Sequence, residues 1–334
     1  MIKKNYILFL LSLTIAKIAV ANVAMPGIWS AGHGSTLTPL FAKDSAAIRW
    51  IQMNKELIVI DLYKNYAVVK GTYWFLNKSQ YTQQIRTGYP INGEFSATIE
   101  DMVSFEDLLY LKVEVGGKKV THYNLADIYD STQTTLASNQ VLNAANNWYV
   151  WDMAFEPGTL TKVEVYFVVK TPAVLIQGYG RKEANAFEYI LQTGANWSGN
   201  IMNGQIIINL KDGLKVSDIN GILPSKRVYY LKDQLYYSFE NLRPTPADDL
   251  IIWYQGNKDS ISLNLDTAQL YKSINNTDTA ILHATNLSLI ERDDFDTSIP
   301  DWGYFIIGFI VLVVGIFVTL LIIIFKFIKK KLKN

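Results

Sequence analysis

The sequence predicts a mainly β protein, with antiparallel β-sandwich domains, a few short helices and one C-terminal transmembrane helix. Three observations support this fold class. Apolar and polar residues alternate through the middle of the chain, turn dipeptides such as Asn92-Gly93 and Asp212-Gly213 separate the alternating runs, and a long apolar stretch lies near the C-terminus. The connections between strands are too short for helical crossovers, which favours antiparallel pairing.

The clearest strand pattern covers residues 162–170, where Val163, Val165 and Phe167 alternate with charged or polar neighbours. Residues 57–63 and 66–76 are rich in β-branched and aromatic side chains, and residues 205–210 alternate in the same way. These segments are the predicted core strands.

Gly116-Gly117 predicts a hairpin whose register follows from a two-residue turn. Val113 then faces Val120 and Glu114 faces Lys119, so the apolar pair and the ion pair fall on opposite sides. A sheet with one buried side requires this separation.

Helical signals are confined to the region before the apolar C-terminal stretch. Asp266 is a predicted N-cap of a helix that runs to Ile274, with Gln269 at the third helical position. Residues 278–291 are expected to form a second helix, and the aspartates that follow it to Asp301 form an acidic spacer.

The predicted domains follow from a break between residues 171 and 185, where Pro172 ends a strand and glycines follow. We expect a β-sandwich domain over residues 40–172, after an N-terminal segment at 22–39. A smaller β domain over 173–262 follows, and a helical segment with the spacer covers 263–303.

The first 21 residues are typical of a secretory signal peptide. Lys3 and Lys4 precede an apolar run, and Ala19-Val20-Ala21 offers a cleavage site, so that Asn22 is the predicted mature start. An uncleaved N-terminal anchor is the alternative, although the run is short for a membrane span.

Residues 304–325 contain no charged side chain and are long enough to cross a bilayer as a helix. Five lysines in the tail at 326–334 favour the cytoplasmic side. The sequence therefore predicts a single-pass protein of the plasma (inner) membrane, with the lipid bilayer as a partner. Its N-terminus and ectodomain lie outside, in the periplasm or at the cell exterior.

Charge and cysteine content narrow the class of protein. The signal segment and tail hold 8 of the 31 Lys and Arg and none of the 30 Asp and Glu, which leaves 23 against 30, a net charge of −7. An acidic ectodomain disfavours nucleic acid as a partner. The absence of cysteine suits a bacterial envelope protein rather than a disulfide-bonded secreted domain.

Several phrases in order carry a resemblance, among them IQMNKELIVIDL at 51–62, VVKGTYWFLNKS at 68–79 and WYVWDMAFEPG at 148–158. They resemble an uncharacterised family of extracytoplasmic bacterial proteins with a domain of unknown function after a signal peptide. The first phrase is also distantly similar to the β-rich domain of vault and inter-alpha-trypsin proteins. The resemblance implies a secreted β domain and no catalytic residue.

No catalytic motif occurs in the sequence, and we predict neither a cofactor nor a metal site. Three histidines lack metal-site spacing; His122 is expected to be a half-buried residue at a strand end. Glu100, Asp101, Glu106 and Asp107 form the densest acidic cluster, which is either an exposed loop or a carboxylate pair for glycoside hydrolysis.

Aromatic residues make up 13% of the chain and suggest a ligand platform or a packed core. In residues 148–151 alternation places Tyr149 and Trp151 on one face of a strand. Tyr149, Trp151 and Trp197 are therefore candidate ligand-binding residues that stack on sugars, and core packing is the alternative.

These observations favour a non-enzymatic interaction or structural module of the cell envelope, held by a single membrane span. Another envelope protein or a glycan is the expected partner. A tethered carbohydrate-binding module is the alternative, and a glycoside hydrolase that uses the acidic cluster is a weaker one.

Overall fold

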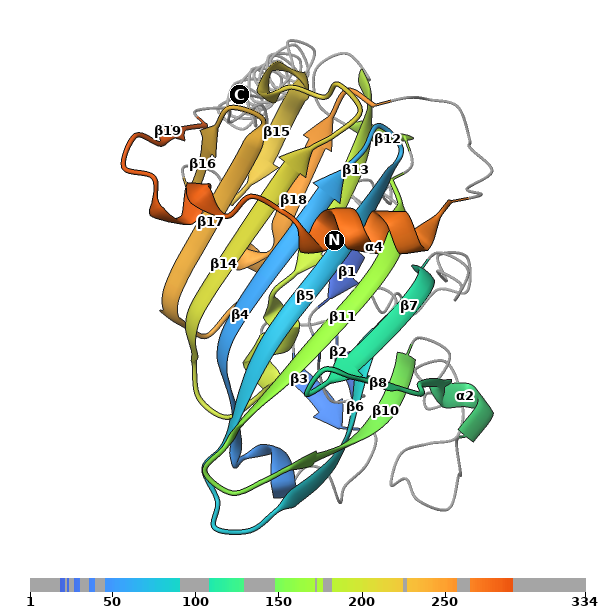
Figure 1. The fold of residues 1–334 in the computed structure, drawn as a ribbon, viewed down its shortest axis with the longest axis vertical. Coiled ribbons are helices and arrows are strands. Elements are labelled where there is room, and N and C mark those ends of the chain that lie inside the picture. Colours follow the sequence, from blue (N-terminus) through green and yellow to red (C-terminus); the bar gives the residue numbers. More distant parts are fainter. Residues whose placement is uncertain are drawn as a thin grey trace, which may run out of the picture. The chain divides into compact units, whose positions relative to one another are not determined.

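The computed structural model describes residues 46–90, 108–128, 148–171, 173–176, 182–224, 227–256 and 265–290, with short N-terminal pieces at 19–21, 23, 27–30 and 36–39. Within this part of the chain the protein is mainly β, as predicted. The largest sheet has nine strands (Figure 1), in the order β19 (Ser288–Leu289), β16 (Val228–Leu231), β17 (Gln234–Leu242), β14 (Ile201–Leu210), β4 (Ile51–Leu62), β5 (Tyr66–Asn77), β11 (Leu160–Lys170), β7 (Leu108–Val115) and β8 (Lys118–Val120).

Three smaller sheets accompany it. One contains β1 (Ala19–Ala21), β13 (Lys182–Ile190), β18 (Leu250–Tyr254) and β15 (Ile219–Leu223), with β12 (Ala173–Ile176) also paired to β13. A second contains β6 (Gln83–Pro90), β10 (Trp148–Phe155) and β9 (Tyr123–Asn124), and a third pairs β2 (Gly27–Ser30) with β3 (Thr36–Pro39). Short helical elements lie between strands: α2 (Leu125–Ile128) and 3-10 turns at Gln192–Asn196, Val216–Asp218 and Pro246–Asp248.

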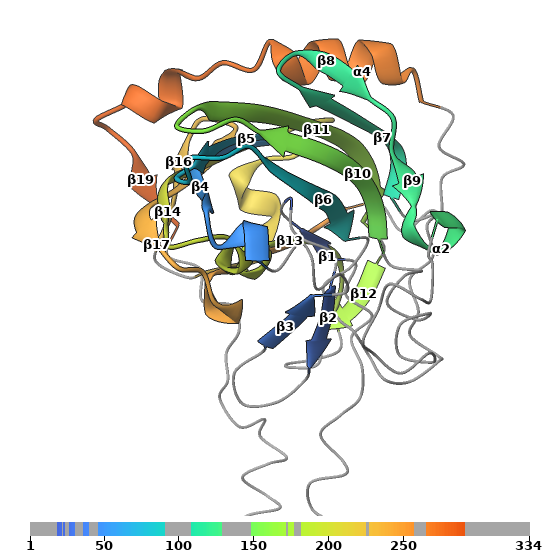
Figure 2. The ribbon, with the colours of Figure 1, turned by 90° about the horizontal axis from the view of Figure 1, so that it is seen from below.

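The large sheet is covered on both faces. Val163, Val165, Phe167 and Val169 of β11 belong to the main core, on the side of the smaller sheets, as their alternation predicted. On the other face α4 (Thr267–Asn275) crosses the sheet, as Figures 1 and 2 show. A second apolar cluster lies beneath this helix and contains Val59, Val68, Tyr166, Val168 and Ile274.

Two local predictions are confirmed at the level of single residues. In the β7–β8 hairpin Val113 pairs with Val120 and Glu114 with Lys119. Asp266 is the N-cap of α4, and its side chain accepts a hydrogen bond from the Gln269 backbone N–H at 3.1 Å. Both features depend on neighbours in sequence, which a short pattern can specify.

The strand pairing differs from the expected two antiparallel domains. β4 and β14 pair in parallel, with Glu56 opposite Gly204 and Ile58 opposite Ile206. They come from the two predicted domains, 40–172 and 173–262, so the described strands of both segments share one sheet and one core. Two parallel strands need a long connection, and the connection between β4 and β14 is the chain from β5 to β13.

The predicted helix at 278–291 is also wrong among the described residues. Residues Ala280–His283 form a 3-10 turn, and Ser288 with Leu289 forms the edge strand β19, which pairs with β16. The apolar residues of this segment pack onto the sheet, since Ile281 and Ile290 are buried. Tertiary contact thus overrides the helical pattern.

None of the helices among the described residues is long and apolar enough to cross a membrane. The predicted span at 304–325, the basic tail and residues 1–18 of the predicted signal peptide lie outside the described residues. Their assignments remain predictions.

Gly71 provides a test of packing in the centre of the large sheet. A Cβ added at this position of β5 would overlap the hydroxyl end of Tyr73, which hydrogen-bonds Tyr189 in the core. We expect Gly71→Ala to lower the free energy of unfolding by about 1 to 3 kcal/mol, measured by chemical denaturation. Adding Tyr73→Phe, which removes the overlapping oxygen, should restore part of this loss; equal stability of Gly71→Ala and the parent chain would contradict the packing described.

Candidate functional site

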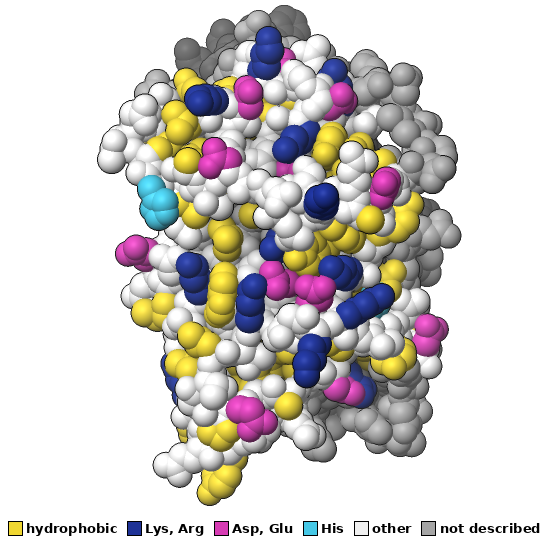
Figure 3. Space-filling model, viewed as in Figure 1, with side chains coloured by type: hydrophobic (Ala, Val, Ile, Leu, Met, Phe, Trp, Pro, Cys, Tyr) yellow, Lys and Arg dark blue, Asp and Glu magenta, His cyan; other side chains and the backbone are white. Residues whose placement is uncertain are grey.

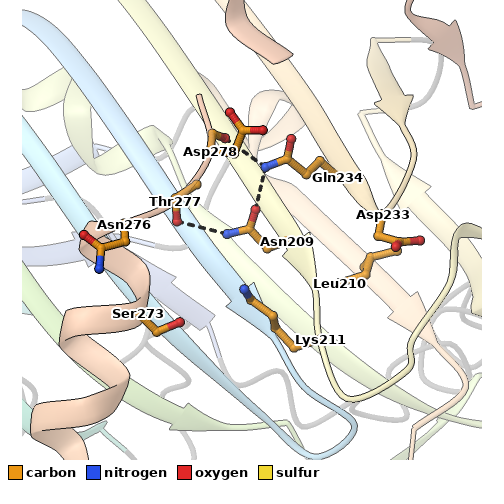
Figure 4. A pocket seen from close by; sticks show the side chains of 9 residues that line it. All are labelled: Asn209, Leu210, Lys211, Asp233, Gln234, Ser273, Asn276, Thr277 and Asp278. Atoms are coloured by element: carbon orange, nitrogen blue, oxygen red, sulfur yellow. Dashed lines mark hydrogen bonds between the residues drawn. The ribbon is translucent and has the colours of Figure 1, made fainter. Parts of the chain in front are cut away.

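A polar hollow of about 450 Å³ lies on the face of the large sheet that carries α4 (Figure 4). The end of β14, the β16–β17 turn and the residues at and after the C-terminus of α4 surround it. Its lining is dominated by amide, hydroxyl and charged side chains, and consists of Asn209, Leu210, Lys211, Asp233, Gln234, Ser273, Asn276, Thr277 and Asp278. The volume is that of a site for a small molecule.

Hydrogen bonds fix the two amide side chains that line the hollow. Asn209 donates through Nδ2 to Asp61 Oδ1 at 2.5 Å and to Thr277 Oγ1 at 3.2 Å. Gln234 Nε2 donates to Asn209 Oδ1 at 2.8 Å and to the Asp278 carbonyl at 2.9 Å. These bonds, drawn in part in Figure 4, orient both amides before any ligand binds.

The charged groups at the hollow are of both signs. Lys211 Nζ lies 3.7 Å from Asp61 Oδ1, and the Asp61 carboxyl is buried below the hollow. Burial raises the pKa of Asp61, while the hydrogen bond from Asn209 and the charge of Lys211 oppose this change. Asp233 and Asp278 bring two further carboxylates to the lining.

The wall formed by α4 is attached to the sheet at its C-terminal end. Asn275 Oδ1 accepts hydrogen bonds from Lys70 Nζ at 2.7 Å and from the Tyr166 hydroxyl at 3.0 Å. The Tyr166 ring also packs against Tyr271 of the helix, with ring centroids 5.2 Å apart. The floor and this wall of the hollow are therefore both held in place by hydrogen bonds.

Elsewhere on this face the charges are interspersed. Figure 3 shows lysine and acidic side chains mixed over the surface. Glu164 lies between Lys70 and Lys162, at 3.1 and 2.9 Å, and these lysines hold the pKa of Glu164 below its ordinary value. No single-sign field marks the described part of this face as a polyanion-binding surface.

The structure places two of the three predicted ligand-binding residues in the core. Trp151 is 1% exposed and Trp197 is 2% exposed, and the Trp197 ring packs on Phe75 with centroids 4.6 Å apart. Tyr149 is half-buried and contacts His122 edge to face. Neither tryptophan presents a free face to a sugar, so the arrangement matches the core-packing alternative.

The other singled-out groups give no site among the described residues. His122 is half-buried near a strand end, as predicted, and burial together with Lys119 lowers its pKa. Within the residues that the structure describes, no group of three or more His, Asp or Glu side chains is arranged to hold a metal ion. The acidic cluster of Glu100, Asp101, Glu106 and Asp107 lies outside the described residues.

Sequence patterns did not identify the hollow. Asn209 lies on the polar face of the strand whose alternation was predicted, where a polar residue is ordinary, and Asp233 and Gln234 lie in and just after a turn that has no distinctive motif. The segment after α4 was predicted to be helical. The one available signal was the polar pair Asp61 and Asn209 at the ends of two otherwise apolar strands, which the parallel register places side by side.

Comparison with known proteins identifies no family. No family model matches the chain, and no curated protein matches it. Similar solved structures include a "putative nutrient binding protein" from Legionella pneumophila subsp. pneumophila, with 16% identity, a TM-score of 0.40, and coverage of 69% of this chain and 71% of that one.

The structures of two enzymes are also similar. An M1 zinc metallopeptidase from Deinococcus radiodurans has 9% identity and a TM-score of 0.32, with 64% of this chain and 44% of that chain covered. The yeast LTA4 hydrolase has 11% identity and a TM-score of 0.32, with 61% and 29% covered. The chain thus spans less than half of either enzyme, and we infer nothing about its function from likenesses of this strength.

Proposed function

We propose that the protein is a non-enzymatic binding module of the bacterial envelope, held at the membrane by one C-terminal helix. The hollow beside α4 is its ligand site. The observation that carries this proposal is the pair of fixed amides, Asn209 and Gln234, at the floor of a hollow with a suitable volume. Preorganised donors and acceptors lower the entropic cost of binding a polar ligand.

The lining favours a small polyhydroxylated ligand, such as a monosaccharide or disaccharide. Amides and hydroxyls donate and accept hydrogen bonds, and carboxylates accept them, so the lining can pair with both the donor and the acceptor of a sugar hydroxyl. We therefore place the carbohydrate site of the alternative function at this hollow and not at the buried tryptophans. Another envelope protein remains the alternative partner, because the same surface is open to a polar segment of a second chain.

The envelope location rests on the sequence. The signal peptide ending at Ala21, the span at 304–325 and the lysine tail together support an exterior β body. Fusion of a reporter enzyme to the C-terminus, compared with insertion of the same reporter after the signal peptide, tests this topology. Activity of both reporters on the same side of the membrane would contradict it.

Asp233 is the best residue with which to test the hollow, because it lines the hollow without belonging to the amide network. We expect Asp233→Asn to weaken binding of a sugar found by glycan array about tenfold, which corresponds to about 1.4 kcal/mol, in calorimetric titration. Asp212→Asn is the matched control, since Asp212 is exposed in the neighbouring turn and asparagine tolerates its positive φ.

Two results would contradict the proposal in different ways. Absence of binding on the array, or equal affinity of Asp233→Asn and the parent chain, would remove the hollow as the site. Turnover of a substrate that stops on mutation of Glu100 or Asp101 would instead contradict the non-enzymatic function.

A further inference from the structure

The orientation of both amides at the floor of the hollow follows from one buried carboxylate. Asp61 is 1% exposed, and its carboxylate only accepts hydrogen bonds, so Asn209 must turn its Nδ2 toward Asp61. The Oδ1 of Asn209 then faces Gln234, and Gln234 must in turn present its Nε2 to that oxygen. The chemical character of the floor is therefore fixed from below.

Both amides have all their N–H donors engaged within the protein. A side-chain amide carries two such donors on its nitrogen. Those of Asn209 bond to Asp61 and Thr277, and those of Gln234 bond to Asn209 and to the Asp278 carbonyl (Figure 4 draws the last three of these bonds). The two amides therefore offer a ligand oxygen acceptors and no further donor.

Three oxygens of this network keep capacity to accept a hydrogen bond. No group among the described residues donates to Gln234 Oε1. Asn209 Oδ1 accepts one bond and has a second lone pair. The Thr277 hydroxyl donates to the Ile274 carbonyl at 2.9 Å, so that toward a ligand it too acts as an acceptor. A ligand group that only donates hydrogen bonds fits this part of the hollow best.

The charge at the hollow favours a cationic ligand. Lys211 and Asp61 lie 3.7 Å apart and compensate each other. Asp233 and Asp278 also line the hollow, and neither carboxylate has an ion-pair partner among the described residues. These four side chains carry one positive and three negative charges, 1 − 3 = −2. A ligand with a positive charge therefore gains attraction at this site, and one with a carboxylate is repelled.

We propose that the hollow selects an amino sugar and binds it through its protonated amine. This inference deepens the function proposed above and rests on the hollow being the ligand site. An ammonium group has three donors and no acceptor, so it matches the free oxygens of Gln234 and Asn209. Asp233 and Asp278 supply the opposite charge. Hydrogen bonds from an ammonium group are stronger than those from a neutral hydroxyl.

Other lining residues provide donors for the sugar hydroxyls. Ser273 lies in the last turn of α4, Asn276 is its C-cap residue, and both are exposed. With Lys211 they bring a hydroxyl, an amide and an ammonium group to the same hollow. A lysine side chain of a partner protein carries the same cation as an amino sugar but no hydroxyls, so these donors favour the sugar as the source of the amine.

The first test is calorimetric titration of the full chain, purified from membranes in detergent, with four sugars. We expect glucosamine to bind at least about tenfold more tightly than glucose or N-acetylglucosamine, which lack the charge, and glucuronic acid to bind most weakly. Raising the ionic strength from about 0.1 M to 1 M shortens the screening length from about 10 to 3 Å. This change should reduce the advantage of glucosamine and leave the affinity for glucose unchanged.

The second test removes one charge and keeps the local structure. Asp278 Oδ1 accepts a hydrogen bond from the Ala280 backbone N–H at 2.9 Å, and asparagine retains that acceptor. We expect Asp278→Asn to weaken glucosamine binding about tenfold and glucose binding less than twofold. Asp233→Asn serves as the second variant if Asp278→Asn lowers the melting temperature, and Asp212→Asn in the neighbouring turn should leave both affinities unchanged.

The outcomes separate this inference from the proposed function. Equal affinity for glucosamine and glucose, or an equal loss for both sugars in Asp278→Asn, would overturn the amino sugar and leave the hollow as a sugar site. Tighter binding of lysine amide than of glucosamine would also overturn it, in favour of a basic segment of a partner protein. Absence of binding by all four sugars would instead contradict the proposed function, and the inference with it.

Discussion

Replacement of Trp197 with alanine is expected to lower the free energy of unfolding by about 3 to 5 kcal/mol. The indole ring is 2% exposed and packs on Phe75 and Phe155, with centroids 4.6 and 6.2 Å away. Its Nε1 donates to the buried Val23 carbonyl, which would lose its partner. For a domain of this size the change corresponds to a fall in melting temperature of about 6 °C or more, measurable by thermal denaturation.

Trp74 is the matched control for this substitution. It lies on β5 facing away from the main core, is half-exposed, and has the Lys55 ammonium 5.2 Å from its ring. Trp74→Ala should therefore cost only about 1 kcal/mol. If Trp197→Ala kept its melting temperature and lost sugar binding, the ligand platform first predicted for Trp197 would replace the core role described here.

The parts of the fold that sequence patterns predicted are those set by neighbouring residues. The β7–β8 hairpin depends on Gly116-Gly117, and its register fixed the pairing of Val113 with Val120. The N-cap of α4 depends on Asp266 and the backbone three residues later. In both cases the physical cause lies within a few residues of the signal.

The missed parts depend on contacts between distant segments. The parallel pairing of β4 with β14 brings Asp61 beside Asn209, residues that no local pattern connects. The bulge between Met53 and Lys55 shifts the inward face of β4 by one residue, which strict alternation does not foresee. The hollow and the buried position of Glu56 both follow from these two features, and so neither was predicted.

The carboxyl of Glu56 is fully buried and has no hydrogen-bond partner among the described residues, and it leads to the second large effect, a dependence of stability on pH. Burial raises the folded pKa of Glu56 from 4.5 to about 8. The folded state then binds the proton more tightly than the unfolded state. The free energy of unfolding of the chain with Glu56, relative to that of the Glu56→Gln variant, is therefore highest below pH 4.5. It should fall by at most about 5 kcal/mol as the pH rises to 8.

The difference between the parent chain and the Glu56→Gln variant isolates Glu56 from other groups. Asp249 also has a pKa raised to about 8 by burial, but it contributes equally to both chains and cancels. Denaturant unfolding of both proteins from pH 4.5 to 9 gives the difference between their free energies of unfolding as a function of pH. A difference curve that does not fall between pH 4.5 and 8 would show that water or relaxation already compensates the carboxylate.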